Sequence, residues 1–369
     1  MAERVFAVAE RPQAPEVLPA FRDLNSYAVP EGRSAYLRMD FNEGPAPDLE
    51  ILAKALTLCA FSATVYPDYD GLKRAAGQAW KVDPSMLLPV NGADEGIALL
   101  MRAFTGPQDA AVLPEPSFPM YRIYADLNGS AVIPVSLTKD FSLDMEATLE
   151  AVPKGAMLTL ASPNNPTGRM VSEAQLLELL EASKGRPVLM DETYAPFCGQ
   201  DFSPLLARFP NLILLRTLSK AYGLPGLRCG LILADSRIIQ RLEPLRPPFN
   251  VNGVAATLGA QMLTSDPGLR ARLRGAVDAR KRVQSGLDAL GIRTIPSDAH
   301  FFLADMGNLA EAVVTMLRER RILVKDLSKT LPGMLRISVA TELEAQAFLE
   351  AFTPWWTHKF SGLCLDNLL

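Results

Sequence analysis

The chain contains very little histidine and cysteine. Only two of its 369 residues are histidines, His300 and His358, so a metal centre with histidine ligands is an unfavourable hypothesis. The four cysteines are far apart and form neither a Cys-x-x-Cys pair nor a metal-ligand spacing; they are Cys59, Cys198, Cys229 and Cys364. We therefore expect no bound metal, and free thiols in a reducing cytosol.

The chain also lacks an excess of positive charge and any long apolar segment. Its formal net charge of −4 provides no basic patch for nucleic acid or for an anionic membrane. No apolar run approaches the ~20 residues of a membrane-spanning helix, and the first six residues, which include an acid, do not resemble a signal peptide. We expect a cytoplasmic globular protein that binds neither nucleic acid nor a membrane.

Short apolar runs alternate with helical periodicity between about residues 85 and 235. Five of these runs have the length and composition of buried strands, at residues 111–113, 157–160, 188–190, 212–215 and 230–233. Apolar residues between them recur on one helical face, as at 97, 100, 101 and 104. This alternation predicts an α/β fold in which a mainly parallel central sheet is covered by helices on both faces.

The length and the changes in pattern predict three parts. Residues 1–45 are proline-rich and irregular, and we expect an arm that joins the small domain. Residues 46–245 would form the large domain. Residues 246–369 would form a smaller α+β domain, with a charged helix from Leu269 towards Leu290, a strand at 300–303, a helix near 308–320 and a strand at 335–339.

Three polar clusters each follow a predicted strand. They are SPNNPTG at 162–168, DETY at 191–194, and the segment RTLSKAYGLPGLR at 216–228, which contains Lys220. Ligands bind open α/β sheets beyond the carboxyl ends of the strands, so we expect the clusters to converge on one site. Together they supply an amine, an acid, an amide, a phenol and a guanidinium, the set needed to hold pyridoxal phosphate and use it as an electron sink.

Each residue of these clusters has a chemical role and a plainer alternative. The amine of Lys220 can form a Schiff base with the cofactor aldehyde and then act as a general base, although a lone loop lysine is usually an ordinary one. Asp191 can pair with the pyridine nitrogen, or simply cap a turn. Tyr194 and Asn165 can donate to the phenolic oxygen of the cofactor, but an asparagine beside proline also forms turns.

The cofactor phosphate and ring need further partners. The NGADE segment at 91–95 precedes a predicted helix, whose start is an anion site, although Asp94 fits helix capping equally well. Ser219 and Arg228 can complete this site by a hydroxyl and a charge. Phe118 can stack on the pyridine ring, but an aromatic residue after a strand is more often part of the core.

Arg336 lies within an apolar strand, in the sequence Leu-Arg-Ile-Ser at 335–338. A buried arginine needs an anionic partner. A substrate carboxylate or phosphate would supply one through a bidentate contact, and an internal salt bridge is the alternative.

These segments resemble those of the fold type I pyridoxal-phosphate aminotransferases of class I and II, in particular the histidinol-phosphate aminotransferase-like branch. The resemblance extends from about Asn42 to Arg336, and its most specific parts are 162–168, 191–194 and 216–228 in this order and spacing. It implies catalytic roles for Lys220, Asp191 and Tyr194. The cofactor residues that it implies are these three with Gly92, Ala93, Asp94, Phe118, Asn165, Thr217, Ser219 and Arg228.

The resemblance also implies a second subunit and a substrate site. Tyr66, in Tyr-Pro-Asp at 66–68, matches the tyrosine that reaches the phosphate of the neighbouring subunit, so a homodimer with shared sites is implied. Arg336 matches the arginine that binds the acidic end of the substrate. We expect Asn42, His300 and Lys325 to take part in substrate binding as well.

The sequence departs from the pattern of this family at three places. Asn42-Glu43-Gly44-Pro45 replaces Asn-Glu-Asn-Pro, and His300 replaces the asparagine of Ala-Asn-Phe. Lys325 stands where a second phosphate-binding arginine is common, and lysine cannot form the same bidentate fork. These changes leave the cofactor chemistry intact and bear on the substrate.

The leading hypothesis is an aminotransferase that converts histidinol phosphate and 2-oxoglutarate to imidazole acetol phosphate and glutamate. The alternatives are an aminotransferase for aromatic or other amino acids, and a lyase similar to threonine-phosphate decarboxylase. A non-catalytic ligand-binding protein is a third possibility, against which the intact clusters argue. A dinucleotide-dependent dehydrogenase is rejected, because the only glycine loop, at 223–226, lacks the GxGxxG pattern and the acid that follows it.

Overall fold

A computed structural model of the chain describes residues 32–360. Its larger sheet has seven strands in the order β2-β8-β7-β6-β5-β3-β4, and only β8 runs in the direction opposite to the other six. These strands are β2 (Leu87–Val90), β3 (Ala110–Glu115), β4 (Ala131–Ser136), β5 (Met157–Ala161), β6 (Val188–Asp191), β7 (Leu212–Thr217) and β8 (Gly230–Ala234). The prediction of a mainly parallel sheet is confirmed.

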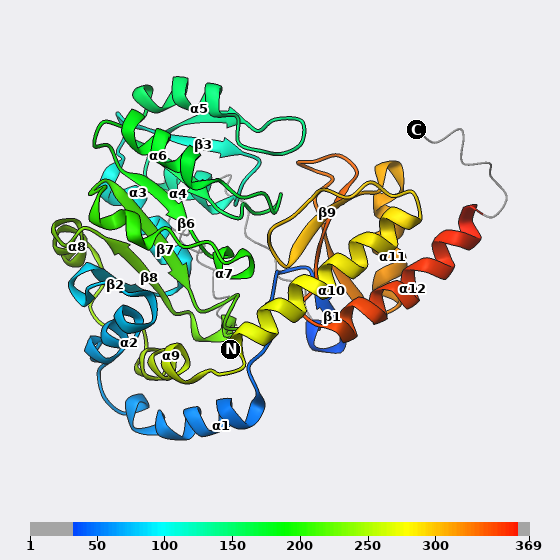
Figure 1. Cartoon of the computed structure of the whole chain (residues 1–369), viewed down its shortest axis with the longest axis horizontal. Helices are drawn as coiled ribbons and strands as arrows, with labels where there is room; N and C mark the ends of the chain where they lie inside the picture. The colour runs from blue at the N-terminus through cyan, green and yellow to red at the C-terminus, as the bar shows by residue number, and fades with distance from the viewer. Residues whose placement is uncertain (1–31, 361–369) are drawn as a thin grey trace, which may run out of the picture. The chain divides into compact units, whose positions relative to one another are not determined.

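Helices cover both faces of this sheet (Figure 1). They are α1 (Leu49–Leu58), α2 (Asp70–Trp80), α3 (Gly92–Phe104), α4 (Met120–Leu127), α5 (Met145–Ala151), α6 (Glu173–Ala182), α7 (Ala195–Cys198), α8 (Ser236–Leu242) and α9 (Gly253–Ser265). Successive strand residues point to opposite faces. Leu212 and Leu214 therefore pack in one core with α6 and α9, whereas Ile213 and Leu215 pack in another with α3 and α8.

Side-chain caps mark where several of these helices begin. Ser172 and Gln175 form a reciprocal capping box at the start of α6. Asn252 accepts a hydrogen bond from the backbone N–H of Ala255 at the start of α9, at 2.8 Å. These caps fix the points at which the chain turns back along the sheet.

A second sheet has four strands in the order β1-β10-β11-β9. Its elements are β1 (Leu37–Met39), β9 (Phe301–Asp305), β10 (Ile322–Asp326) and β11 (Met334–Ser338), with α10 (Leu269–Ala289), α11 (Ala310–Glu319) and α12 (Glu342–Phe360). One face, with Phe302 and Ile337, packs on these helices. The predicted strands and helices of this region are therefore present, and β1 adds a strand parallel to β10.

The two cores meet within the long helix α10. Helix α9 lies beside α1 and α2 and buries Leu258 in the core of the large sheet (Figure 1). Ala276 of α10 belongs to that same core, whereas Val283 belongs to the core of the small sheet. The domain division at residues 45 and 245 stays a prediction, and residues 1–31 of the predicted arm lie outside the described residues. Within residues 32–360, no helix combines the length and apolar character needed to cross a membrane.

Leu214 offers a test of the large core. It is fully buried in β7, an inner strand of the sheet. We expect Leu214→Ala to lower the free energy of unfolding by about 2–5 kcal/mol, because the substitution leaves a cavity that the rigid sheet cannot fill. Leu127→Ala, at a leucine that is 40% exposed, should change it by less than about 0.5 kcal/mol. The thermal unfolding midpoints of both variants measure this, and equal midpoints would contradict the packing.

Candidate active site

The three polar clusters lie at one edge of the large sheet. Strands β5, β6 and β7 are neighbours and run parallel, so their carboxyl ends lie at the same edge. Asn165 follows β5, Asp191 ends β6, and Lys220 comes three residues after β7. The structure therefore brings an amide, a carboxylate and an amine together, from segments up to 55 residues apart in the sequence.

Lys220 is held in a defined position. Its Nζ donates a hydrogen bond to the carbonyl oxygen of Phe41 at 2.8 Å. Burial, and secondly the nearby charge of Arg336, lower the pKa of Lys220 to about 8. An ordinary lysine is almost wholly protonated at neutral pH. The Lys220 amine is instead neutral in an appreciable fraction of molecules, and the neutral amine is the nucleophilic and basic form.

Segment 40–42 contacts three of the site residues. Besides the bond between Lys220 and Phe41, the Nη2 of Arg336 donates to the carbonyl oxygen of Asp40 at 2.5 Å. The Nδ2 of Asn42 donates to the phenolic oxygen of Tyr194 at 3.0 Å. This segment directly follows β1 of the small sheet, so it links that sheet to the residues at the edge of the large one.

Asp191 is buried and held from both sides. Its Oδ1 accepts from the backbone N–H of Thr193 at 2.9 Å, and its Oδ2 accepts from the hydroxyl of Tyr121 at 2.7 Å. Burial raises the pKa of Asp191, although both hydrogen bonds oppose that change. A buried carboxylate in this state is suited to pair with a cationic N–H of a ligand.

Arg228 lies across the start of helix α3. Its Nη2 donates to Asp94 at 2.9 Å and its Nη1 to the Oγ of Ser219 at 3.3 Å. Gly92 has a φ of +74°, and a Cβ atom there would overlap the guanidinium of Arg228, so only glycine fits. The first N–H groups of α3, which include that of Ala93, have no partner within the helix and favour an anion. The guanidinium of Arg228, the hydroxyl of Ser219 and the N–H groups at the start of α3 thus lie around one potential anion site.

Two further predicted cofactor residues are fixed by their neighbours. The Oγ1 of Thr217 accepts from the backbone N–H of Ser219 at 3.1 Å and lies 3.1 Å from the carbonyl oxygen of Cys229, to which it can donate. Thr217 thereby orients Ser219. The ring of Phe118 packs edge-to-face on Tyr121, with ring centroids 5.8 Å apart. Phe118 is therefore adjacent to the tyrosine that binds Asp191.

Arg336 and Lys325 form a pair of neighbouring cations. The Nη1 of Arg336 donates to the Oδ1 of Asn165 at 2.5 Å, so this arginine of the small sheet reaches the loop after β5. Lys325 lies directly opposite Arg336 in the pairing of β10 with β11. Burial, and secondly the charge of Arg336, lower the pKa of Lys325. A carboxylate or phosphate beside both residues would reduce the repulsion between their two positive charges.

His300 is fully buried among aromatic rings. Its ring stacks on Phe197 with centroids 4.2 Å apart, and the ring of Tyr194 lies 5.9 Å away. Burial, and secondly the charge of Lys220, lower the pKa of His300 to about 3, so the imidazole is neutral at physiological pH. Neither ring nitrogen makes a hydrogen bond of normal geometry with a residue in the described part of the chain. His300 can therefore offer a neutral hydrogen-bonding group but not a general base.

Tyr66 lies on the surface, apart from the cluster around Lys220. Its ring is 79% exposed and stacks on Phe249, with centroids 4.4 Å apart.

Sequence reasoning missed three contributors. Tyr121 binds Asp191 and lies only three residues after Phe118, the aromatic residue that the sequence indicated. Asn164 joins that segment to the loop after β5: its Nδ2 donates to the carbonyl oxygen of Pro116 at 3.0 Å, and its Oδ1 accepts from Ser117 at 2.7 Å. The carbonyl groups of residues 40 and 41 carry no side-chain signal, so no motif identifies them.

The chain is similar to known proteins over most of its length. Residues 44–352 match the family described as aminotransferase class I and II. The chain belongs to this family. A histidinol-phosphate aminotransferase of Thermococcus gammatolerans is 35% identical over 89% of this chain and 94% of its own length. Histidinol-phosphate aminotransferase 2 of Nitrosococcus oceani is 37% identical over 91% of this chain and 96% of its own.

A solved structure of this family has the same fold. Histidinol-phosphate aminotransferase from Sinorhizobium meliloti, in complex with pyridoxal-5'-phosphate, superposes with a TM-score of 0.85 and 22% identity, over 94% of this chain and 99% of the other. At this identity the likeness shows the fold, which is therefore that of the class I and II aminotransferases.

The influence of Arg336 on Lys220 can be measured in the cofactor-free protein. Arg336→Gln removes a nearby positive charge, so the protonated amine becomes less unfavourable and the pKa of Lys220 should rise above about 8. Labelling of Lys220 by an amine-selective reagent, followed by mass spectrometry across pH 6–10, should then shift to higher pH. Arg336→Lys keeps a charge and should shift it less. Arg318→Gln, at an exposed position of α11, is the control, and identical profiles for all variants would contradict the coupling.

Proposed function

We propose that this chain is a pyridoxal-phosphate-dependent aminotransferase that transfers the amino group of histidinol phosphate to 2-oxoglutarate, giving imidazole acetol phosphate and glutamate. Membership of the class I and II family and the names of its curated relatives support the activity and the donor. The observation that carries the proposal is the Lys220 amine, whose pKa is lowered, beside two cations that suit an acidic substrate.

The residues of the site fit the cofactor. Its phosphate would lie at the start of α3, held by Arg228 and Ser219, because a cation, a hydroxyl and free helix N–H groups already surround that place. The carboxylate of Asp191 is buried, and a protonated pyridine N–H is the partner that stabilises its charge. Tyr194 and Asn165 would bind the phenolic oxygen. When bound, pyridoxal phosphate supplies an aldehyde for amines and a ring that accepts electron density.

Lys220 would move the proton. With a pKa near 8 its amine is neutral in an appreciable fraction of molecules at physiological pH, so it can take a proton from the substrate Cα and return it elsewhere. The carbonyl oxygen of Phe41 provides a fixed position for the free amine at 2.8 Å. Phe118 would lie against one face of the cofactor ring and restrict its tilt.

The acidic end of the substrate would lie between the small sheet and the loop after β5. Arg336 provides a planar fork that matches a carboxylate or phosphate, and Lys325 provides a second, point-like charge. Asn42 and His300 lie around Tyr194, where they would contact the rest of the donor. Because His300 is neutral, it would do so by hydrogen bonding or packing.

Two other reactions use a similar scaffold. An aminotransferase for aromatic amino acids would keep the whole cofactor site and differ in the residues around His300 and Lys325. A lyase similar to threonine-phosphate decarboxylase would release carbon dioxide, which a transaminase does not. The half-reaction below distinguishes the donors, and a carbon dioxide assay with threonine phosphate distinguishes the lyase.

The half-reaction with the donor alone tests this function. We expect L-histidinol phosphate, added to the cofactor-loaded protein without an acceptor, to convert the visible spectrum to that of the amine form of the cofactor. Lys220→Ala should lower this rate at least about a hundredfold, since it removes the general base. Conversion by phenylalanine but not by histidinol phosphate would overturn the proposed donor. Undiminished turnover in Lys220→Ala would overturn the role of that lysine.

We propose further that two copies of this chain form a homodimer. Exposed apolar side chains gather around α1 and the segment that follows it: Leu49, Leu56, Leu58, Phe61, Val65, Tyr66 and Phe249. An exposed apolar patch of this kind favours contact with another protein surface. A second copy would cover it, and Tyr66 would then reach the phosphate site of that copy.

Mixed dimers test this arrangement. Lys220→Ala and Tyr66→Ala subunits should each be impaired alone. After mixing and subunit exchange, one site of each mixed dimer would combine an intact Lys220 with an intact Tyr66 from the other subunit. We therefore expect activity to reappear on mixing, measured as turnover per total protein. Activity equal to the average of the two variants would show that Tyr66 serves its own subunit or none.

A cytoplasmic location is part of the proposal. The cysteines of the described residues, Cys59, Cys198 and Cys229, are free thiols, which is the usual state in a reducing compartment.

A further inference from the structure

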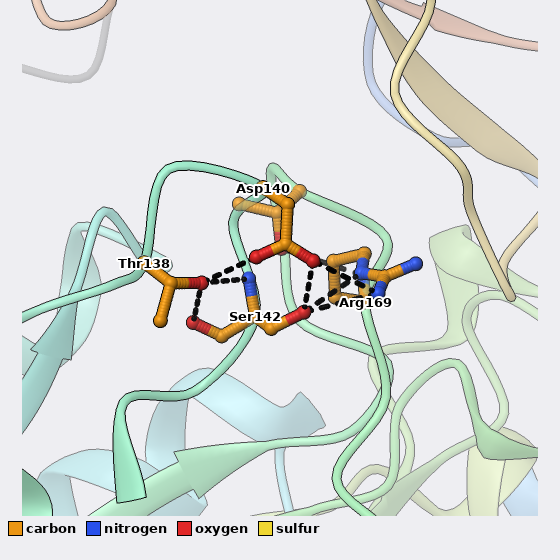
Figure 2. Close-up of polar contacts among 5 residues, drawn as sticks. Thr138, Asp140, Ser142 and Arg169 are labelled. Carbon is orange, nitrogen blue, oxygen red and sulfur yellow. Dashed lines mark hydrogen bonds and ion pairs between the residues drawn. The ribbon is translucent and has the colours of Figure 1, made fainter. Parts of the chain in front are cut away.

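A hydrogen-bonded turn on the large domain lies between β4 and α5. The hydroxyl of Thr138 donates to Asp140 at 2.5 Å, and that of Ser142 donates to the same carboxylate at 2.8 Å. The backbone closes the turn through Phe141 N–H to the carbonyl oxygen of Thr138, at 2.9 Å. Figure 2 shows these contacts converging on Asp140, with Arg169 approaching from the opposite side. Two hydroxyl donors thus hold this carboxylate in one orientation.

Arg169 connects this turn to the active-site loop. Its Nη2 donates to the Oγ of Ser142 at 3.0 Å and lies 3.4 Å from the carboxylate of Asp140. Arg169 directly follows residues 162–168, and its carbonyl oxygen accepts from the N–H of Asn164 at 2.8 Å, which closes the loop that carries Asn165. The turn and the loop therefore form one connected unit.

Phe141 extends from this unit to the small sheet. Its φ of +63° is left-handed, a conformation that a bulky residue adopts only where its surroundings stabilise it. Its side chain packs against Ile295, Leu303 and Met334, none of which belongs to the large sheet. A residue of the large domain thus contacts the small sheet directly.

The contacted face is the one that carries Arg336. Leu303 is the residue directly opposite Arg336 in the pairing of β9 with β11, and Met334 precedes Arg336 by two residues on the same strand. Both positions point to the same side of the sheet as Arg336. Phe141 therefore packs on a cluster that contains two of the same-face neighbours of Arg336, whose guanidinium binds Asn165 at 2.5 Å.

We infer that Phe141, held by the contacts of Asp140 and Arg169, is a positioning residue that fixes Arg336 against Asn165 and thereby sets the affinity for the anionic group of the substrate. This inference rests on the proposed function for the role of Arg336. The apolar contact and the Arg336–Asn165 bond join the same two surfaces, so loosening one loosens the other. The hydrogen bond that holds Lys220 goes to the carbonyl oxygen of Phe41 and does not involve Phe141.

Phe141→Ala in the cofactor-loaded protein tests the inference. We expect the KM for L-histidinol phosphate, and the Kd of the unreactive dicarboxylate glutarate, to rise about three- to tenfold, with kcat changed less than about twofold. Hydrogen–deuterium exchange should accelerate in residues 300–305 and 334–338 before any substrate is added. Phe141→Leu should restore most of both effects. Phe209→Ala is the matched control, since Phe209 is also half-buried but lies before β7, at the opposite edge of the sheet.

Arg169→Ala should shift the same quantities in the same direction. Since it acts through the same unit, the double variant Phe141→Ala/Arg169→Ala should be no weaker in binding than the weaker single variant. Fully additive effects would show that the turn does not act through Phe141 and would overturn the inference.

The exchange measurement separates this inference from the proposed function. Unchanged exchange in Phe141→Ala overturns the positioning role whatever the substrate is. Faster exchange with unchanged affinity for both ligands overturns it as well. If wild-type protein does not turn over histidinol phosphate, only the proposed donor fails, and faster exchange with weaker glutarate binding still supports Phe141.

Discussion

The structure of the site depends on the close packing of segment 40–45 against Lys220. The carbonyl groups of residues 40 and 41 accept hydrogen bonds from Arg336 and Lys220, and Asn42 donates to Tyr194. Gly44 allows this approach, because a Cβ atom there would overlap the backbone carbonyl of Lys220. The segment follows an edge strand of the small sheet, so the position of that sheet and the position of the amine are determined together.

Burial of the site shifts the pKa values of its titratable residues. It is the first cause of the lowered pKa of Lys220 and of the raised pKa of Asp191, and it keeps His300 neutral. A buried charge is stabilised only by a partner, so a ligand with an acidic group, an aldehyde and a basic ring nitrogen would suit these groups. Burial that disfavours charges in the empty site would therefore favour binding of the proposed cofactor.

The sequence predicted the sheet well because its signal is local and physical. Buried parallel strands need unbroken apolar runs, and those at 188–190 and 212–215 became neighbouring strands. Polar residues directly after such runs could be placed at one edge for the same reason. The contacts of segment 40–42 could not be predicted, because backbone carbonyls are alike in every residue. The packing of α9 with the large core also escaped prediction, since an apolar helix face does not specify which sheet it covers.

The two sheets carry different parts of the proposed site. The large sheet carries the residues proposed for the cofactor, from Gly92 to Arg228, and these depend on strand ends that the core holds rigid. The face of the small sheet that carries Leu303, Met334 and Arg336 bears the proposed substrate contacts, and it touches the large domain through Asn165 and Phe141. Substitution of a few residues on this face, or of residues that contact it, could therefore change the selectivity for a donor without altering the cofactor site. The departures from the family pattern at positions 300 and 325 lie in the small sheet or directly beside it, which is where such a change would be expected.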